Sequence, residues 1–174
     1  SSISSNVPIE QAECEFPVQV KFYGLVCDSG GAGKFRGGLA IQRKWQLLSG
    51  SANVTIRSDR RDHLPYGLQG GKSGKPSMNK LFHDKESVVL PTMISTVLEA
   101  GHMLSHQLAG GGGWGDPLTR DLEAIIDDVK NEKVSPEAAR KEYGVVICES
   151  TGEVDYISTK ALRKQMQNKG EKGS

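Results

Sequence analysis

Four consecutive glycines at positions 110–113 constrain the fold of this sequence more than any other feature. Glycine loses more conformational entropy on folding than any other residue, so a packed glycine run needs a compensating reason. A phosphate cradle, a flexible linker and a crossing too crowded for side chains are the competing explanations. Trp114 and Asp116-Pro117 follow at once, and an amphipathic pattern begins at Leu118, which argues against a linker. We favour the crowded crossing, with a nest of N–H groups for an anion as the alternative.

Two further glycine-rich segments resemble phosphate-binding loops, but their spacing fails. In the first, Gly-Lys-Ser occupies residues 71–73. A phosphate-binding loop requires a glycine five positions before Gly71, and Tyr66 occupies that position. In the second, residues 30–38, Phe35 stands where a Ser or Thr must hold magnesium. We therefore interpret both segments as turns and not as nucleotide sites.

Composition indicates one ordinary globular chain. The sequence has 174 residues, of which 36% are hydrophobic and 25% charged, and its apolar runs are too short to cross a bilayer. No secretory signal opens it. Cys14, Cys27 and Cys148 are odd in number and widely spaced, which favours reduced thiols and a cytoplasmic location. The absence of a C-x-x-C pair argues against a zinc ribbon.

Charge is distributed unevenly although the net charge is only +1. Residues 34–80 carry ten basic and two acidic side chains, whereas residues 81–156 carry six basic and fourteen acidic ones. This asymmetry indicates pairing of the two halves, or pairing with a partner subunit, more than a nucleic-acid surface, because aromatic residues are scarce. We expect neither a nucleic-acid nor a membrane partner.

The first two thirds of the sequence predict β structure. Alternating apolar residues mark strands within 18–28, 39–48, 54–58, 87–91, 95–101 and 102–110, and the second and third are expected to form a hairpin through a turn at 49–53. The predicted fold class is mainly β with C-terminal helices (α+β). Its body is expected to be an antiparallel sandwich or barrel-like sheet, followed by two or three short helices and a hairpin.

The last third changes to helical periodicity. Apolar spacing predicts a helix over 118–131 that is opened by Asp116-Pro117, and a second helix from Ser135 to the cap Gly144. A hairpin over 145–157 and a basic helix from Thr159 to Asn168 follow. The predicted organisation is a glycine-rich β domain (1–117), a helical extension with its hairpin (118–168) and a disordered tail (169–174).

No nucleophile motif occurs in the sequence, so no catalytic residue is assigned. His102 and His106 fall on an expected strand, about 13 Å apart, and would not share a metal, so no metal site is predicted. Arg57, Arg60 and Arg61 follow a strand and are candidates for binding an anion or for a salt-bridged turn. Arg36 and the glycines Gly111, Gly112 and Gly113 complete the substrate- or anion-binding candidates. The structural candidates are Gly30, Gly31, Gly33, Gly37, Gly38, Trp114, Asp116 and Pro117.

Four motifs in order resemble the C-terminal part of the hydantoinase B/oxoprolinase family. They are PVQVKFYGLVCDSGGAGKFRGGLAIQRKW at 17–45, PYGLQGG at 65–71, GGGGWGDPLTRD at 110–121 and VSPEAARKEYGVVI at 134–147. The resemblance extends over about residues 6–147 and weakly to 163. The end of the chain is more similar to a separate bacterial-type B subunit, as in ATP-dependent N-methylhydantoinases, than to a fused oxoprolinase.

The resemblance implies that the chain is part of a larger ATP-dependent hydrolase of cyclic amides. It contributes to structure, subunit docking and one wall of the active site, and is inactive alone. Its partners are the N-terminal part of the same B subunit and an A-type subunit in a hetero-oligomer. No cofactor is expected in this part; ATP and Mg belong to the A-type subunit, and any catalytic metal to the N-terminal part. A portion of an acetone/acetophenone-type carboxylase and a non-catalytic scaffold are the alternatives.

This resemblance leads to a hypothesis about the anion-binding candidates. Segment 29–38, the arginines at 57, 60 and 61, and the four glycines are expected to line a cleft or a subunit interface that serves a phosphorylated intermediate. Glycine backbone and arginine are the anion-binding resources of this chain. The substrate, whether hydantoin, oxoproline, lactam or ketone, is not specified by the sequence.

Overall fold

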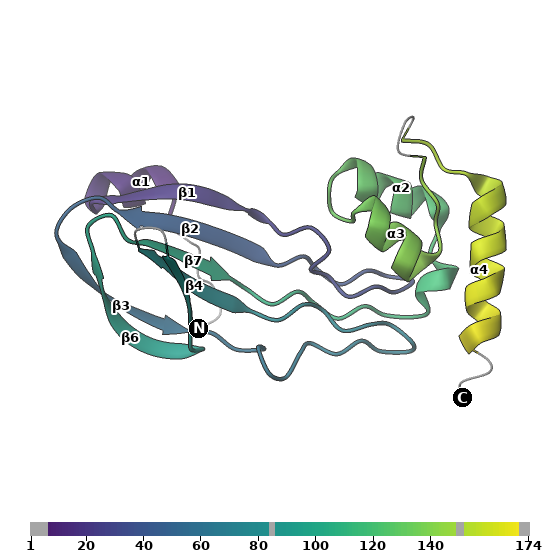
Figure 1. Cartoon of the computed structure of the whole chain (residues 1–174), viewed down its shortest axis with the longest axis horizontal. Helices are drawn as coiled ribbons and strands as arrows, with labels where there is room; N and C mark the ends of the chain where they lie inside the picture. Colours follow the sequence, from purple (N-terminus) through teal and green to yellow (C-terminus); the bar gives the residue numbers. More distant parts are fainter. Residues whose placement is uncertain (1–6, 84–85, 149–151, 171–174) are drawn as a thin grey trace. The chain divides into compact units, whose positions relative to one another are not determined.

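The computed structural model describes residues 7–83, 86–148 and 152–170 of the chain, which divides into two compact units (Figure 1). Unit 1 comprises Ser1–Gly24, Ile41–Arg61 and Ser77–Leu108, and unit 2 comprises Leu25–Ala40, Asp62–Pro76 and Ala109–Ser174. The chain thus enters each unit more than once, whereas the sequence analysis placed a single boundary after residue 117. Among the described residues, no helix combines the length and the apolar character needed to cross a membrane.

Unit 1 contains one helix and two sheets. The helix is α1 (Ile9–Glu15), and the strands are β1 (Val18–Leu25), β2 (Ile41–Leu47), β3 (Ser51–Arg57), β4 (Met78–His83), β5 (Glu86–Leu90), β6 (Met93–Glu99) and β7 (Met103–Gln107). Five strands form a sheet in the order β1-β2-β7-β4-β5, and β3 pairs with β6 in a second sheet (Figure 1). The β2–β7, β4–β7, β4–β5 and β3–β6 pairs are antiparallel.

The core of unit 1 lies between apolar faces of these strands. Its buried members are Leu47, Ile56, Leu90, Leu98 and Leu104. In the register of the larger sheet, Trp45 stands opposite Leu104, which in turn stands opposite Leu81, so these side chains share one face. The predicted class, antiparallel β with C-terminal helices, is confirmed, and both sheets are open.

The predicted hairpin between residues 39–48 and 54–58 is wrong. β3 pairs with β6 over Ser51–Arg57 and Met93–Glu99 and not with β2. The chain bends at Ser49 and Gly50, while β3 includes the other three residues of the predicted turn. A bend fixes only the direction of the chain, and the pairing partner is chosen by burial of apolar faces. β4 and α1 were not predicted, because β4 carries Lys80 and His83 among its apolar residues and α1 buries no side chain.

Unit 2 holds the remaining helices, of which α3 begins and ends as its capping residues predict. The 3₁₀ turn η1 (Pro117–Thr119) and helix α2 (Leu122–Lys130) replace the single helix expected over 118–131. Helix α3 (Pro136–Tyr143) is capped by Ser135, whose hydroxyl accepts from the Ala138 N–H, and by Gly144 at φ 64°. Around these helices Ile125, Val134, Ala139, Tyr143 and Val145 form a core.

The C-terminal predictions are met in part. Ile147 and Val154 form an isolated antiparallel bridge where the hairpin was expected, and residues 149–151 lie outside the described residues. Helix α4 (Tyr156–Gly170) is longer than the predicted helix and takes in the first two residues of the predicted disordered tail. The last four residues of that tail also lie outside the described residues.

Three glycine-rich segments of unit 2, residues 29–38, 65–75 and 109–116, hydrogen-bond to one another through their backbones. We call this arrangement the glycine lattice. The Gly111 N–H donates to the Gly38 carbonyl at 2.8 Å, and the Gly113 N–H donates to the Lys72 carbonyl at 2.9 Å. The Lys72 N–H donates to the Ala32 carbonyl at 2.7 Å, which closes the set of three pairs. Each segment therefore satisfies backbone groups of the other two without belonging to a regular sheet.

The lattice leaves no room for Cβ atoms at most of its glycines. A Cβ added to Gly110 or Gly113 would lie closer than 3.0 Å to the carbonyl of Ser29 or Ala32, and one at Gly112 equally close to the Tyr66 carbonyl. Gly110 and Gly113, three residues apart, thus face the same neighbouring segment. A repeat of three residues per turn is that of a polyproline-II-type helix. The four glycines are therefore a crowded crossing of backbones.

Gly113→Ala is expected to lower the free energy of unfolding by at least about 3 kcal/mol, because its Cβ would meet backbone that cannot rotate away. Gly38→Ala is the matched control, since nothing lies within 4 Å of its Cβ. Its effect is expected to stay below about 1 kcal/mol and to stabilise if anything. Urea unfolding followed by circular dichroism compares the two variants, and equal losses of stability would contradict the lattice.

Candidate functional site

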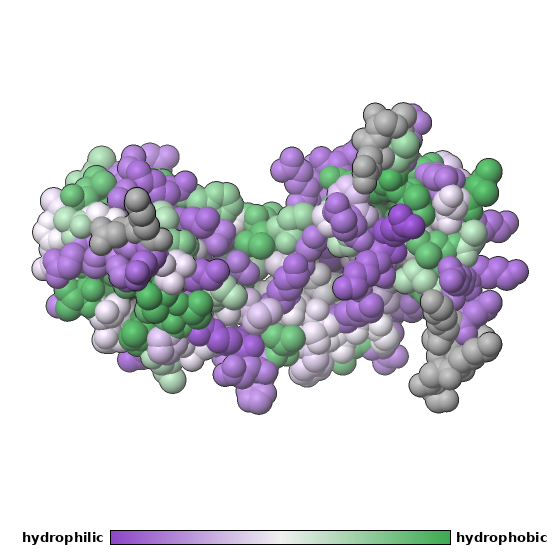
Figure 2. All heavy atoms as spheres, in the orientation of Figure 1, coloured by the Kyte–Doolittle hydropathy of each residue, from purple (hydrophilic) through white to green (hydrophobic). Residues whose placement is uncertain are grey.

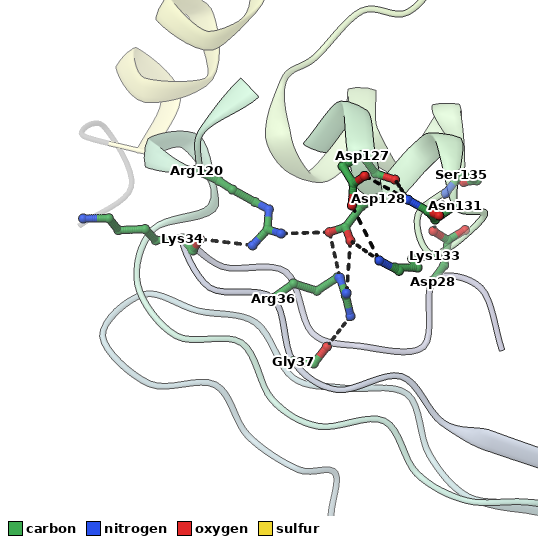
Figure 3. A network of polar contacts seen from close by, with 10 residues as sticks. All are labelled: Asp28, Lys34, Arg36, Gly37, Arg120, Asp127, Asp128, Asn131, Lys133 and Ser135. Atoms are coloured by element: carbon green, nitrogen blue, oxygen red, sulfur yellow. Dashed lines mark hydrogen bonds and ion pairs between the residues drawn. The ribbon is translucent and has the colours of Figure 1, made fainter. Parts of the chain in front are cut away.

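A buried carboxylate, Asp128 in the last turn of α2, lies at the centre of a polar network in unit 2 (Figure 3). The Arg36 guanidinium donates to both of its oxygens, from Nε to Oδ2 at 2.9 Å and from Nη2 to Oδ1 at 3.1 Å. Arg120 donates to Oδ2 from Nη2 at 2.8 Å. Asp128 is only 4% exposed, so these charge-assisted bonds compensate the loss of its hydration.

A further nitrogen of each guanidinium group binds the glycine lattice, whereas Arg120 Nε is buried and has no partner among the described residues. Arg36 Nη1 donates to the Gly37 carbonyl at 2.7 Å, and Arg120 Nη1 donates to the Lys34 carbonyl at 3.1 Å. Because Asp128 belongs to α2 and both carbonyls belong to segment 29–38, the network fastens the helices to the lattice (Figure 3). The hydrogen bond to Asp128 raises the pKa of Arg36, against the opposing effect of burial.

Tyr143, at the end of α3, completes the surroundings of the network. It is 2% exposed, and the Arg120 guanidinium lies 6.0 Å from the centre of its ring. Burial raises the pKa of Tyr143, while the positive charges of Arg120 and Arg36 act in the opposite direction. The phenol therefore stays neutral at physiological pH and packs as a core residue.

The charged groups of this network are bound to one another. Arg36, a candidate for anion binding, already holds the carboxylate of Asp128, and both oxygens of that carboxylate accept hydrogen bonds. Both carboxylate oxygens are therefore held by protein donors, and Asp128 acts as the counter-charge of the two arginines. The arrangement serves to hold elements together.

Two of the three candidate glycines, Gly111 and Gly113, have their backbone donors engaged in the same way. The N–H groups of Gly110, Gly111 and Gly113 all donate to carbonyls of the lattice, and Gly112 packs against the Tyr66 carbonyl. An anion nest at this place would need those N–H groups. The geometry at residues 110–113 is therefore that of backbone packing.

The structural candidates also lie in the lattice or directly after it. Gly30, Gly31, Gly33 and Gly37 each face backbone closer than 3.0 Å to an added Cβ, whereas Gly38 faces open space. Trp114 exchanges two backbone hydrogen bonds with Phe35, both 2.9 Å long. The Asp116 carboxylate accepts from the Leu118 N–H at 2.9 Å, and Pro117 is buried as the first residue of η1.

Arg57, Arg60 and Arg61 belong to unit 1, and Arg36 and the glycines to unit 2. Arg61 is half-buried and donates from Nη1 to the Leu90 carbonyl at 2.6 Å, so it supports the turn after β3. Arg57 and Arg60 are exposed, and Arg60 Nε lies 3.9 Å from the Asp59 carboxylate. A common cleft for these arginines and the lattice stays a prediction.

Only one of the two histidines predicted on a common strand lies in it. His106 is in β7, and His102 precedes that strand and accepts a hydrogen bond from the Glu99 N–H at Nδ1. Within residues 7–83, 86–148 and 152–170, no group of three or more His, Cys, Asp or Glu side chains is arranged to hold a metal. All three cysteines are exposed, and no disulfide joins them.

His106 takes part in a polar cluster within unit 1. Its Nδ1 lies 2.7 Å from Oδ1 of Asn79, which is fully buried in β4. The Asn79 amide nitrogen donates to the Ser58 hydroxyl and to the Pro91 carbonyl, so its oxygen is the acceptor toward His106. His106 is therefore neutral with the proton on Nδ1. Burial, and secondly the charge of Arg43, lowers its pKa.

The sequence analysis missed Asp128, Arg120 and Asn79. Asp128 carries the clearest signal, since it stands three residues after Ile125 and next to Val129, on the apolar face of α2. A carboxylate on a buried helical face needs a cationic partner. The sequence does not indicate which cation this partner is, because Arg36 lies 92 residues away from Asp128.

Comparison with known proteins identifies the family. The model of the family described as Hydantoinase B/oxoprolinase matches residues 2–117, more than half of the chain, and the chain belongs to this family. An uncharacterized protein of Methanocaldococcus jannaschii is 38% identical over 91% of the chain and 28% of its own length. Caprolactamase subunit beta of Pseudomonas jessenii is 35% identical over 89% of the chain and 27% of its own length.

Two solved structures share the fold. The ATP-dependent caprolactamase from Pseudomonas jessenii superposes with a TM-score of 0.81 at 34% identity, covering 90% of this chain and 28% of that one. An acetone carboxylase has the same TM-score of 0.81 at 20% identity, covering 97% of this chain and 27% of that one, which shows the fold alone. The chain thus spans only about a quarter of the length of these relatives.

Asp128→Asn is expected to lower the free energy of unfolding by about 3–5 kcal/mol, because two buried guanidinium groups lose their counter-charge. Asp127→Asn is the control at the adjacent position. Asp127 is 67% exposed and lies 3.6 Å from Lys133, so its loss is expected to cost under about 1 kcal/mol. Denaturant titration of both variants measures the difference, and equal costs would show that the network contributes little.

The stability of unit 1 is expected to fall as the pH drops below about 6.5, the ordinary histidine pKa. Below this pH the imidazole of residue 106 becomes protonated in the unfolded chain, whereas in the folded protein its lowered pKa keeps it neutral to a lower pH. This stabilising contribution is complete above the unfolded pKa and is lost as the pH falls toward the folded one. His106→Gln is expected to flatten the stability profile measured by urea unfolding between pH 7 and 5, while the exposed control His63→Gln keeps it. An unchanged slope in His106→Gln would refute this role.

Proposed function

We propose that this chain is the C-terminal portion of the B subunit of an ATP-dependent hydrolase of cyclic amides. The observation that supports this most is its 35% identity, over 89% of its residues, to the beta subunit of a caprolactamase. A 5-oxoprolinase of Arabidopsis thaliana, 36% identical over 61% of the chain, points to the same class of reaction. A lactam and oxoproline share a ring amide, which is the chemical group the proposed enzyme opens.

ATP has a clear chemical use in such a reaction. The carbonyl of a ring amide is a poor electrophile, and transfer of the γ-phosphoryl group of ATP to its oxygen makes its carbon more electrophilic. Water then attacks that carbon, the ring C–N bond breaks as the nitrogen takes up a proton, and a second water hydrolyses the resulting acyl phosphate to the acid and phosphate. These steps require that the developing negative charge is stabilised and that the site excludes bulk solvent. In this proposal ATP and Mg bind the A-type subunit, and any catalytic metal binds the rest of the B subunit.

Within that enzyme, the proposed role of this chain is to support structure and subunit docking. Arg36 and the N–H groups of Gly111 and Gly113, which are among the anion-binding candidates of unit 2, are engaged with protein groups. This commitment favours a supporting role over a direct part in the chemistry. Arg57 and Arg60 are the exposed arginines of the candidate set, and they are the ones proposed to face a partner or an anion.

A test uses the intact native gene product, co-expressed with its A-type subunit and supplied with ATP. Release of ADP together with the ring-opened acid is expected from caprolactam, hydantoin or 5-oxoproline. The 174-residue chain alone is expected to show no turnover of ATP or of any ring substrate. Consumption of acetone and bicarbonate in place of a ring amide would instead assign the carboxylase alternative, and turnover by the chain alone would overturn the supporting role.

A further inference from the structure

Unit 1 contains an apolar cavity of about 720 Å³ that is open to one side. Side chains from α1, β1, β2, β3 and β6 line it, most of them aliphatic or aromatic. The lining includes Val18 and Val20 of β1, Trp45 of β2, and Ala52 and Val54 of β3. A space of this size would hold several amino-acid side chains or one drug-sized molecule.

The walls of this cavity are also the margin of the hydrophobic core. Val18, Trp45, Ala52 and Val54 pack against the buried core of unit 1 on one side and line the cavity on the other. Helix α1 beside it buries no residue, and Phe16 is 57% exposed. Apolar surface left in water forgoes about 25 cal/mol per Å², so a core open along one side is incomplete.

Trp45 contributes its ring to the lining, whereas its indole nitrogen is turned away from the open space. Trp45 Nε1 is buried and has no hydrogen-bond acceptor among the described residues. The cavity is therefore defined by its apolar walls, and its occupant must be mostly apolar. A polypeptide segment rich in aliphatic side chains has this property.

The one guanidinium that lines the cavity is already engaged. Arg43 donates to the Tyr23 hydroxyl at 3.1 Å and stacks over the Tyr23 ring at 4.6 Å. Among the residues that the structure describes, the lining contains no aspartate or glutamate. An apolar polypeptide segment fits such walls better than a strongly charged ligand does.

We infer that a segment of the remaining B-subunit polypeptide fills this cavity and completes the core of unit 1. This inference rests on the proposed function, because the chain spans only 27–28% of the relatives' lengths and most of such a polypeptide lies outside it. Apolar residues are exposed elsewhere on unit 1 as well, among them Met93 at 72% and Val97 at 50% on β6. Figure 2 shows apolar side chains at the surface over the strands that Figure 1 labels β3 and β6.

Cysteine labelling at adjacent residues of β1 tests the inference. Val20 lines the cavity, whereas Gln19 is exposed and points to the opposite face of the strand. Val20→Cys and Gln19→Cys are made both in the intact native gene product and in the 174-residue chain, and maleimide labelling is followed by peptide mass mapping. The ratio of the rate at position 20 to that at position 19 is expected to be at least about tenfold lower in the intact product.

An unchanged ratio of labelling rates would overturn the inference. Slow labelling at position 20 of the 174-residue chain, if the rate falls as the concentration of that chain rises, would also overturn it, because a second copy would then occupy the cavity. Labelling requires neither ATP nor turnover, so its result is interpreted separately from the activity test of the proposed function. Protection of position 20 without hydrolysis of cyclic amides would leave the inference standing and reject the proposed function. Hydrolysis of cyclic amides without protection of position 20 would support the proposed function and reject the inference.

Discussion

Contact between backbones that carry no Cβ atoms is the constraint on which unit 2 depends. Gly110 and Gly113 approach the carbonyls of Ser29 and Ala32, and Gly112 approaches that of Tyr66, so three segments far apart in sequence share one core of peptide groups. Their side chains are left to point outward: Phe35, Tyr66, Leu68 and Trp114 are all exposed. Hydrogen bonds between segments replace the hydrophobic packing that would otherwise hold such loops. The entropy that glycine loses on folding is offset by this dense bonding.

The signals that were read correctly are local ones. The tetraglycine with Trp114 after it indicated a crowded crossing, and Ser135 and Gly144 marked the ends of a helix, because capping depends on neighbours in the chain. The signals that failed are non-local. The pairing of β3 with β6 and the bond between Arg36 and Asp128 join residues far apart in sequence, and no short pattern records which partner is chosen. The family resemblance supplied the functional class, which residue patterns alone did not reach.

The two units give complementary reasons to regard this chain as part of a larger assembly. In unit 2, Arg36 and the N–H groups of Gly111 and Gly113 are bonded to other protein groups, which fastens the helices and the glycine lattice together. In unit 1 the core opens into an apolar cavity. The bonded groups of unit 2 and the open apolar cavity of unit 1 are both consistent with a chain that spans about a quarter of its relatives' length.

Hydrogen exchange at the glycine run measures the central constraint most directly. The amides of Gly110, Gly111 and Gly113 donate to Lys75, Gly38 and Lys72, so they are expected to exchange at least about a hundredfold more slowly than in an unstructured chain. Glycine-selective NMR labelling, or mass spectrometry with electron-transfer fragmentation, resolves these positions in the folded chain. Exchange of these amides at the rate of an unfolded peptide would show that the segments are separated in solution and would contradict the lattice.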